Sequence, residues 1–286
     1  MSHGNRLIAG YRWLGYTAVW PAAYALGVYV LLRLALNAPL PDGLDIIYIL
    51  LVGHACYLLD RVKVSDHRQD PADAMALPQR SLLYARQGSA IRAVLVLEVV
   101  VAVAIGVAIH PVLGAIPLLG LITVHLYAGR GATPGSPRFK DLPALKAFIV
   151  ATGHLALAVA VFWAGNPGLL TDAVWIPLSV VAGIWLIVIG DATLCDIDDE
   201  HADRAFDTYS PAVLLGRRRA WRLAAGLVTL GSAVLVVVAG PRLAIGGAAG
   251  LLVISTLLTR ANTNHRDFVD ARLLPIVLIG MLAAMV

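Results

Sequence analysis

The sequence predicts an all-α fold, a polytopic membrane helical bundle, on three observations. Hydrophobic residues make up 59% of the 286 positions and charged residues only 14%, whereas a soluble domain is about one quarter charged. The apolar residues form continuous runs, and a run of roughly 20 residues is long enough to cross a bilayer as a helix. Lysine and arginine gather at alternate connections between these runs, which is typical of membrane proteins.

Nine apolar stretches predict nine transmembrane helices in a single domain that covers residues 1–286. The basic segment Met1–Arg12 comes before the first stretch and predicts a retained helix rather than a cleaved signal peptide. The stretches, in chain order, are Leu14–Leu36, Leu44–Leu59, Ala93–Ile109, Val112–Tyr127, Ala147–Ala164, Ala173–Ile189, Leu223–Ala239, Leu243–Leu258 and Leu273–Val286.

The connections between the stretches predict the topology. Long, charged loops follow the second, fourth, sixth and eighth stretches. If the N-terminus lies on their side, twenty of the 22 basic residues fall there, and only Arg33 and Arg242 fall opposite. This asymmetry predicts an integral protein of the cell inner membrane, with the N-terminus cytoplasmic and the C-terminus outside. The formal charge of +4 therefore reflects topology, and no nucleic-acid partner is expected.

The loop after the sixth stretch carries Asp196, Asp199 and Asp203, whose spacing places them on one face of a helix. Like charges stacked in this way repel one another unless a cation lies among them. Carboxylate oxygens suit Mg²⁺, which usually bridges protein carboxylates to substrate phosphates. Arg204 and the run Arg217–Arg219 offer charges for those phosphates. The alternative is a solvated acidic helix that pairs with the same arginines.

The loop after the second stretch is also acidic. Asp66, Asp70 and Asp73 would share one helical face. However, Asp70 before Pro71, with Asp73 three residues later, is also a good helix start, which explains both acids without a metal. Asp60 ends the second stretch and is followed by Arg61, so the alternative to metal binding there is a simple ion pair.

The segment Asp196-Ile-Asp-Asp-Glu-His-Ala-Asp-Arg204, followed by Ser210-Pro-Ala-Val-Leu-Leu-Gly216, resembles the second aspartate-rich motif of the UbiA superfamily of intramembrane prenyltransferases. Nine helices with acidic loops after the second and the sixth also look like that family. The resemblance covers the whole chain in architecture and about twenty residues in its best motif. Where the family has a basic pair before a threonine, this chain has Thr208-Tyr209 before Ser210.

The resemblance implies an enzyme that holds a prenyl diphosphate through Mg²⁺ between the two acidic loops. The prenyl group would pass from the diphosphate to a hydrophobic acceptor, often an aromatic ring, inside the lipid bilayer. Asp196, Asp199 and Asp203 would be ligands of one Mg²⁺ ion.

The first motif of the family, N-D-x-x-D-x-x-x-D, is eroded in this chain. If Asp66 and Asp70 are its last two acids, the leading pair has become Val62-Lys63. If Asp60-Arg61 matches the central D-R, the leading pair has become Cys56-Tyr57. In these registers Asp60, Asp66 and Asp70 are candidate metal ligands, and the last two are also candidate catalytic residues.

Basic residues near both motifs are candidates for binding the diphosphate. Leu77-Pro-Gln-Arg80 resembles the family's N-R-P segment downstream of the first motif. The segment Lys140–Lys146 resembles the basic loop that faces the diphosphate, although it also fits ordinary positive-inside flanking. The candidates are Arg80, Lys140, Lys146 and Arg204.

Glu98 lies within the third stretch, where an ionisable group is costly and usually faces the bundle interior. It is a candidate catalytic residue that would orient or deprotonate the acceptor. The alternative is a protonated or histidine-paired structural group. His54, His125 and His154 are interpreted as hydrogen bonders between helices.

Three functions remain open at this point. The first is Mg²⁺-dependent prenyl transfer. The second is terpene cyclisation on the same scaffold, in which the ionised chain attacks itself. The third is a non-catalytic lipid-binding or transport protein that retains the fold.

Overall fold

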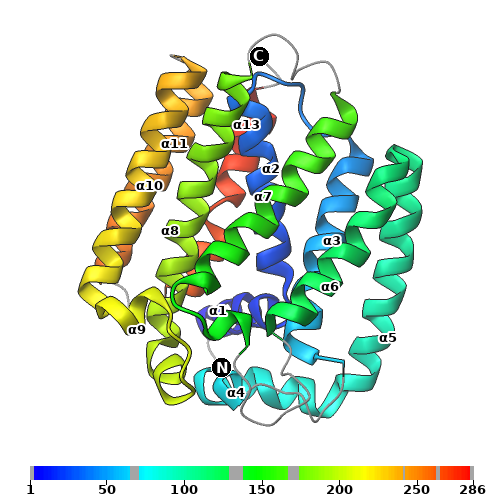
Figure 1. Cartoon of the computed structure of the whole chain (residues 1–286), viewed down its shortest axis with the longest axis vertical. Helices are drawn as coiled ribbons and strands as arrows, with labels where there is room; N and C mark the ends of the chain where they lie inside the picture. The colour runs from blue at the N-terminus through cyan, green and yellow to red at the C-terminus, as the bar shows by residue number, and fades with distance from the viewer. Residues whose placement is uncertain are drawn as a thin grey trace.

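A computed structural model describes residues 3–64, 71–128, 138–166, 174–240, 242–261 and 265–283. All regular elements within these ranges are helices, most of them running along the long axis of the bundle (Figure 1). The α-helices are α1 (His3–Tyr16), α2 (Val19–Ala35), α3 (Gly43–Val62), α4 (Pro71–Ala76), α5 (Pro78–Ile109), α6 (Ile116–Ala128), α7 (Leu145–Gly165), α8 (Trp175–Ala205), α9 (Pro211–Leu215), α10 (Arg217–Ala239), α11 (Leu243–Leu258), α12 (Arg266–Ala271) and α13 (Leu274–Ala283). The 3₁₀ helices are η2 (Pro111–Ala115), η3 (Phe139–Asp141) and η5 (Thr259–Ala261).

The predicted all-α fold is confirmed, but the count of nine transmembrane helices is not. In the described chain, six helices are long and apolar enough to cross a membrane: α3, α5, η2 with α6, α7, α8 and α10. A seventh is reached if the bent pair of α1 and α2 counts as one span. Helices α11 and α13, with 16 and 10 residues, are shorter than the roughly 20 residues of a full crossing. Each predicted stretch nevertheless contains a helix.

The first predicted stretch is broken by a corner. Helix α1 lies across the lower end of the bundle, and its last turns meet α2 at 78° (Figure 1). Ala18 adopts left-handed backbone angles at this corner, with φ 66°. Since α1 ends at Tyr16, its last carbonyl groups need new donors. Arg61 donates to the carbonyls of Gly15 and Tyr16, and Tyr84 donates to Tyr16 at 2.7 Å.

Glu98 supports the same corner. Its carboxylate lies 2.9 Å from Nδ1 of His54, whose Nε2 lies 2.7 Å from the carbonyl oxygen of Thr17. Because that carbonyl only accepts, Nε2 of His54 carries a proton and donates it. Glu98 is not among the residues that line the cavity described below. This placement favours the histidine-paired structural role for Glu98 over the catalytic one.

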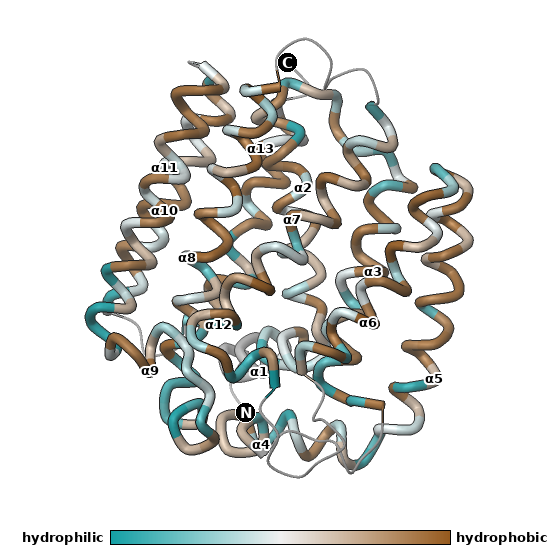
Figure 2. Tube along the Cα trace, in the orientation of Figure 1, coloured by the Kyte–Doolittle hydropathy of each residue, from teal (hydrophilic) through white to brown (hydrophobic). Residues whose placement is uncertain are grey.

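The main hydrophobic core draws buried side chains from several helices, among them Tyr29 of α2 and Ile184 and Leu194 of α8. Helices α8 and α10 approach closely at Gly183 and Gly231. A Cβ atom on Gly231 would collide with the carbonyl oxygen of Gly183, so glycine permits this contact. Hydrophobic residues dominate the middle of the helices, and hydrophilic residues gather at the lower end (Figure 2). The polar residues of α8 project from that lower end.

Candidate metal and diphosphate site

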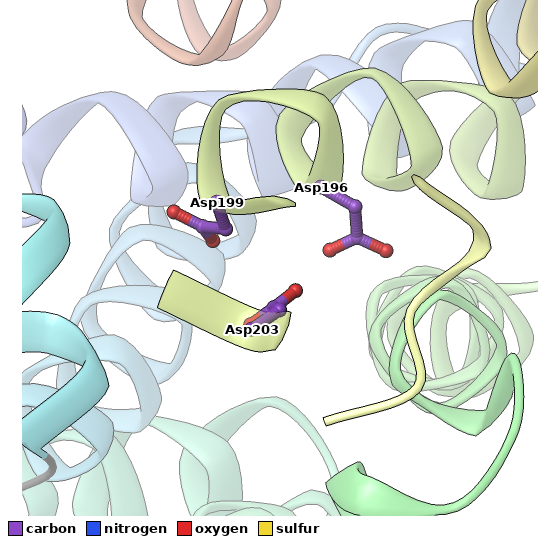
Figure 3. A group of neighbouring side chains, drawn as sticks. All are labelled: Asp196, Asp199 and Asp203. Atoms are coloured by element: carbon purple, nitrogen blue, oxygen red, sulfur yellow. The ribbon is translucent and has the colours of Figure 1, made fainter. Parts of the chain in front are cut away.

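Three aspartates of α8 form a compact cluster, here named the aspartate triad: Asp196, Asp199 and Asp203. The helix continues without a break through Ala205, so the three side chains leave successive turns and gather on one side (Figure 3). One carboxylate oxygen from each lies within 4.8 Å of the others. The predicted common face is therefore present, and it is turned inward: Asp196 and Asp203 are buried, at 2% and 5% exposure.

The ammonium group of Lys146 lies among the three carboxylates. Its Nζ is 2.9 Å from Asp196, 3.2 Å from Asp199 and 3.0 Å from Asp203. Lys146 is the second residue of α7, and helices α7 and α8 pack side by side. One positive charge thus faces three carboxylates, of which those of Asp196 and Asp203 are buried. Arg266 of α12 adds a second positive charge by contacting Asp199.

The triad suits a divalent cation. Its donors are all carboxylate oxygens, the ligand type that Mg²⁺ prefers. Oδ2 of Asp196 is buried and makes no hydrogen bond within the described chain. Burying a polar atom without a partner is costly, and a cation at the triad would remove that cost. Asp196, Asp199 and Asp203 are therefore the residues that would hold Mg²⁺.

Asp198 lies between the triad residues but points away from them, and it positions α12. Its carboxylate accepts hydrogen bonds from the backbone N–H groups of His265 and Arg266, at 2.7 and 2.8 Å. Nδ1 of His265 lies 2.8 Å from the same carboxylate. These bonds fix the start of α12, and so they place the Arg266 guanidinium on Asp199.

The facing wall of the site comes from α3, α4 and α5, and its acids have individual cations. Asp60 lies 2.7 Å from Nζ of Lys63, and Asp73 lies 3.3 Å from Arg80. Lys63 is only 6% exposed and has a φ of 55°. The left-handed backbone at Lys63 ends α3 and returns its side chain to Asp60. The simple ion pair considered for Asp60 is therefore present, but its partner is Lys63 rather than Arg61.

The loop before α7 is tied to the loop after α8. Asp141 accepts hydrogen bonds from Arg138 at 2.9 Å and from Thr208 at 2.7 Å. Burial raises the pKa of Asp141, but these hydrogen bonds lower it more, so its pKa lies below the usual aspartate range. The backbone N–H of Ala144 also donates to the carbonyl of Tyr209. Thr208 and Tyr209, which depart from the family's basic pair, thus hold the loop that carries Lys140.

A cavity of about 450 Å³ runs from this polar end into the bundle. The aspartate triad, Asp60, Arg80, Lys140, Lys146 and Arg266 line its polar part. Apolar side chains of α3, α6 and α7 line most of the remainder, among them Val52, Ile116, Leu119, Ile149 and Leu157. The polar end of the cavity therefore suits an anionic head group, and the apolar part suits a hydrocarbon chain.

One polar pair lies in the deeper, apolar part of the cavity. The Tyr57 hydroxyl is 3.4 Å from Nε2 of His154, and both residues line the cavity. Nδ1 of His154 lies 2.8 Å from the carbonyl of Val150 and must donate to it, so Nε2 is an acceptor. His154 follows Lys146 by eight residues on α7, which places it about 12 Å deeper along the helix axis.

Asp191 is a further buried acid on the cavity wall, one that already has partners. It accepts a hydrogen bond from Tyr24 at 2.7 Å and pairs with Arg272. Arg272 also donates to Thr256 at 2.6 Å. A buried ion pair of this kind fixes the packing of α2, α8 and the segment before α13, and it leaves the metal assignment with the triad.

The remaining candidate residues differ in whether they line the cavity. Arg80, Lys140 and Lys146 line the cavity near the triad. Arg204 is largely exposed and pairs with Glu200 at 2.9 Å, and it is not among the lining residues. Asp66 and Asp70 lie outside the described residues, so whether they face the triad or cap a helix stays a prediction.

Arg266 and Lys63 are site residues that the sequence did not single out. Arg266 follows α11 among residues that fit positive-inside flanking, and nothing in its local pattern shows that it meets Asp199. Lys63 had a weak signal: it follows Asp60 by three residues, which permits a pair at a helix end.

The fold is similar to solved structures of UbiA homologues. A UbiA homologue from Archaeoglobus fulgidus bound to GPP and Mg²⁺ is 15% identical, with a TM-score of 0.61 over 95% of this chain and 99% of that chain. The structure of the homologue bound to DMAPP and Mg²⁺ gives a TM-score of 0.59 at 15% identity, over 95% and 99% of the two chains. A digeranylgeranylglyceryl phosphate synthase is 14% identical, with a TM-score of 0.54 over 94% and 96%.

These likenesses confirm at the level of the fold the resemblance carried by the second aspartate-rich motif. The chain has the UbiA fold over nearly its whole length. No protein-family model matches the chain, and no curated protein sequence matches it.

Proposed function

We propose that this chain is a Mg²⁺-dependent prenyltransferase of the UbiA superfamily. It would transfer a prenyl group from a prenyl diphosphate to a hydrophobic acceptor, such as an aromatic compound or a lipid, within the membrane. The observation that carries this proposal is the convergence of three carboxylates, two of them buried, on Lys146 at the polar mouth of an apolar cavity. The solved structures with this fold that are bound to GPP or DMAPP together with Mg²⁺ support it.

In this proposal the polar end of the cavity holds the diphosphate. The aspartate triad would hold Mg²⁺, which would supply positive charge toward the leaving diphosphate. Arg80, Lys140 and Lys146 supply further positive charge around the phosphate oxygens, where fixed charges stabilise the leaving group. When the bond from carbon 1 to oxygen breaks, its electron pair leaves with the diphosphate.

The apolar part of the cavity receives the prenyl chain and excludes water from the allylic cation. A bond then forms between carbon 1 and the acceptor, which loses a proton. The deep pair of Tyr57 and His154 is the polar feature of this part that suits a hydroxyl group of the acceptor, because Nε2 of His154 accepts a hydrogen bond.

The test is diphosphate release by the purified protein. It is incubated in lipid nanodiscs with labelled dimethylallyl, geranyl or geranylgeranyl diphosphate, with Mg²⁺ or with a chelator. Mg²⁺-dependent release that is lost in Asp203→Asn supports prenyl-diphosphate ionisation. A cyclised hydrocarbon as the product in the absence of acceptor would assign the chain to the terpene cyclases. Mg²⁺-dependent binding without release overturns the enzymatic proposal and favours a lipid-binding protein.

We also propose that the triad end of the bundle faces the cytoplasm of an inner membrane, with α1 on the same side. Ser210, an obvious labelling position by sequence, is fully buried, whereas Tyr209 is 45% exposed. In a chain without Cys56 and Cys195, a cysteine replacing Tyr209 is expected to react with an impermeant reagent only from the cytoplasmic side. Labelling of this cysteine in intact cells from outside would show that the triad end faces outward, and the proposed topology would be wrong.

A further inference from the structure

A second, strongly basic depression lies at the triad end of the bundle, outside the cavity of about 450 Å³ that the triad lines, here named the prenyl cavity after its proposed ligand. The depression measures about 620 Å³. Four of its lining side chains are arginines, here named the arginine basin: Arg217, Arg218 and Arg222 from α10, and Arg260 from η5. The first three come from one helix, and the fourth returns from the end of α11, which packs beside α10. Two separate chain segments therefore direct guanidinium groups toward the same space.

The charge of the basin is poorly balanced by the protein. Within the described part of the chain, the single ion pair that its arginines make is a distant one, 4.0 Å between Arg217 and Glu200. Arg217 also donates to the carbonyl of Ile197 at 3.1 Å. Arg260 stacks over the Trp221 ring at 5.8 Å from its centroid. Guanidinium groups bind phosphate oxygens through paired N–H donors, so the basin matches a phosphate better than it matches any acid of this chain.

Two of the residues that line the basin are held by hydrogen bonds to neighbouring segments. The Trp221 indole N–H donates to Thr259 at 3.0 Å, which ties α10 to η5. His265 also lines the basin, and its ring is held by Asp198 at 2.8 Å. These bonds hold Trp221 and His265 in place, whereas the four arginines around them are exposed to solvent.

The surroundings indicate which phosphate it would hold. Apolar side chains on the outer faces of α10 and α11 continue from the basin along the bundle, including Leu223, Ile254 and Leu258 at 41%, 60% and 65% exposure. Figure 2 shows the same change, from hydrophilic at the lower end of α10 to hydrophobic above it. A phosphate in the basin would therefore lie next to a surface suited to acyl chains. Tryptophan at such a boundary is typical of membrane interfaces.

We propose that the arginine basin binds the phosphate head group of an anionic phospholipid, whose acyl chains lie along α10 and α11. Ordinary positive-inside flanking explains basic residues at this end of the bundle. It does not require that arginines from two segments converge on one depression around a tryptophan. Basic pockets between membrane helices are a known way of holding anionic head groups. The inference does not depend on the proposed prenyl transfer, because the basin shares no lining residue with the prenyl cavity.

The test compares two variants that each lose two positive charges. The double variant Arg218→Gln and Arg222→Gln removes two of the four arginines of the basin. Arg12→Gln with Arg86→Gln removes two exposed arginines from α1 and α5 at the same end of the bundle. Delipidated protein is titrated with phosphatidylglycerol or phosphatidylcholine in detergent, and bound lipid is counted by native mass spectrometry. Inorganic phosphate forms a separate arm, read by the shift in melting temperature.

The parent and the control variant are expected to prefer phosphatidylglycerol to phosphatidylcholine. The basin variant should bind phosphatidylglycerol on the order of 10- to 30-fold more weakly, as expected for two basic residues near an anionic lipid. A melting temperature without added lipid that equals the parent's shows that the basin variant is folded. Equal retention of phosphatidylglycerol by all three proteins overturns the proposal. Basin-dependent stabilisation by inorganic phosphate, with no preference for phosphatidylglycerol, also overturns it and assigns the basin to a free phosphate compound.

Discussion

Aspartates lie on two facing walls of the cavity of about 450 Å³, yet the walls differ in how these acids are neutralised. On α8, three carboxylates share the ammonium of Lys146, with Arg266 on one of them. On the wall of α3 to α5, Asp60 pairs with Lys63 and Asp73 with Arg80. Clustered acids with too few cations are suited to a metal ion, whereas acids with individual cations are largely satisfied. We therefore propose that α8 holds the metal and that the facing wall acts on the diphosphate mainly through its cations.

The largest effect is expected from Lys146→Gln in the absence of Mg²⁺. Removing this ammonium leaves three carboxylates, two of them buried, without their shared cation, and breaking a buried ion pair in this way costs about 3–5 kcal/mol. The melting temperature should fall markedly, and Mg²⁺ should restore much of the loss, because the metal replaces the missing charge. Thermal unfolding with and without Mg²⁺ measures this. A Lys146→Gln protein as stable as the parent in chelator would show that the triad does not need a cation.

A smaller effect is expected from Asp199→Asn and Asp203→Asn, measured as Mg²⁺-dependent binding of geranyl diphosphate. Substituting a group that only orients a metal ligand typically lowers metal affinity by about 10–100-fold. Substituting a ligand itself should therefore weaken Mg²⁺-dependent binding by at least that much. Glu200→Gln is the matched control, because Glu200 pairs with the exposed Arg204. Asp198 is unsuitable as a control, since it positions Arg266 through the start of α12. Equal binding of geranyl diphosphate by all variants would show that the triad does not hold the metal.

The smallest effect is expected from Asp60→Asn in the same binding assay. Because Lys63 already neutralises Asp60, and the carboxylate is partly exposed, affinity should change by less than about threefold, the range of exposed ion pairs. If Asp60→Asn weakens binding as strongly as Asp199→Asn, both walls hold metal, and the contrast between them is wrong.

Much of this account follows from the sequence because it depends on local spacing. The three- and four-residue intervals of Asp196, Asp199 and Asp203 predict one helical face, and the structure has that face. Long apolar runs predict helices for the same reason, and each run contains one. The run Leu14–Leu36 also illustrates the limit of this reasoning. Hydropathy does not reveal the left-handed Ala18 or the corner that divides this stretch.

The parts that the sequence did not predict are contacts between distant segments. Arg266 meets Asp199, and Arg272 meets Asp191, only after the last helices fold back on α8. Glu98 looks catalytic by its membrane depth, but its neighbour His54 and the corner at Thr17 are visible only in three dimensions. Likewise, positive-inside flanking does not distinguish Arg204, which is exposed, from Arg80, which is buried on the cavity wall.

The central claim is that the aspartate triad of α8 holds the divalent cation. The most direct test is an experimental structure determined with Mn²⁺ and geranyl diphosphate, in which anomalous scattering locates the metal. We expect Mn²⁺ density among the carboxylates of Asp196, Asp199 and Asp203, with the Lys146 ammonium moved from their centre toward the diphosphate. Metal density beside Asp60 alone, with Lys146 still bound to all three aspartates, would contradict the account.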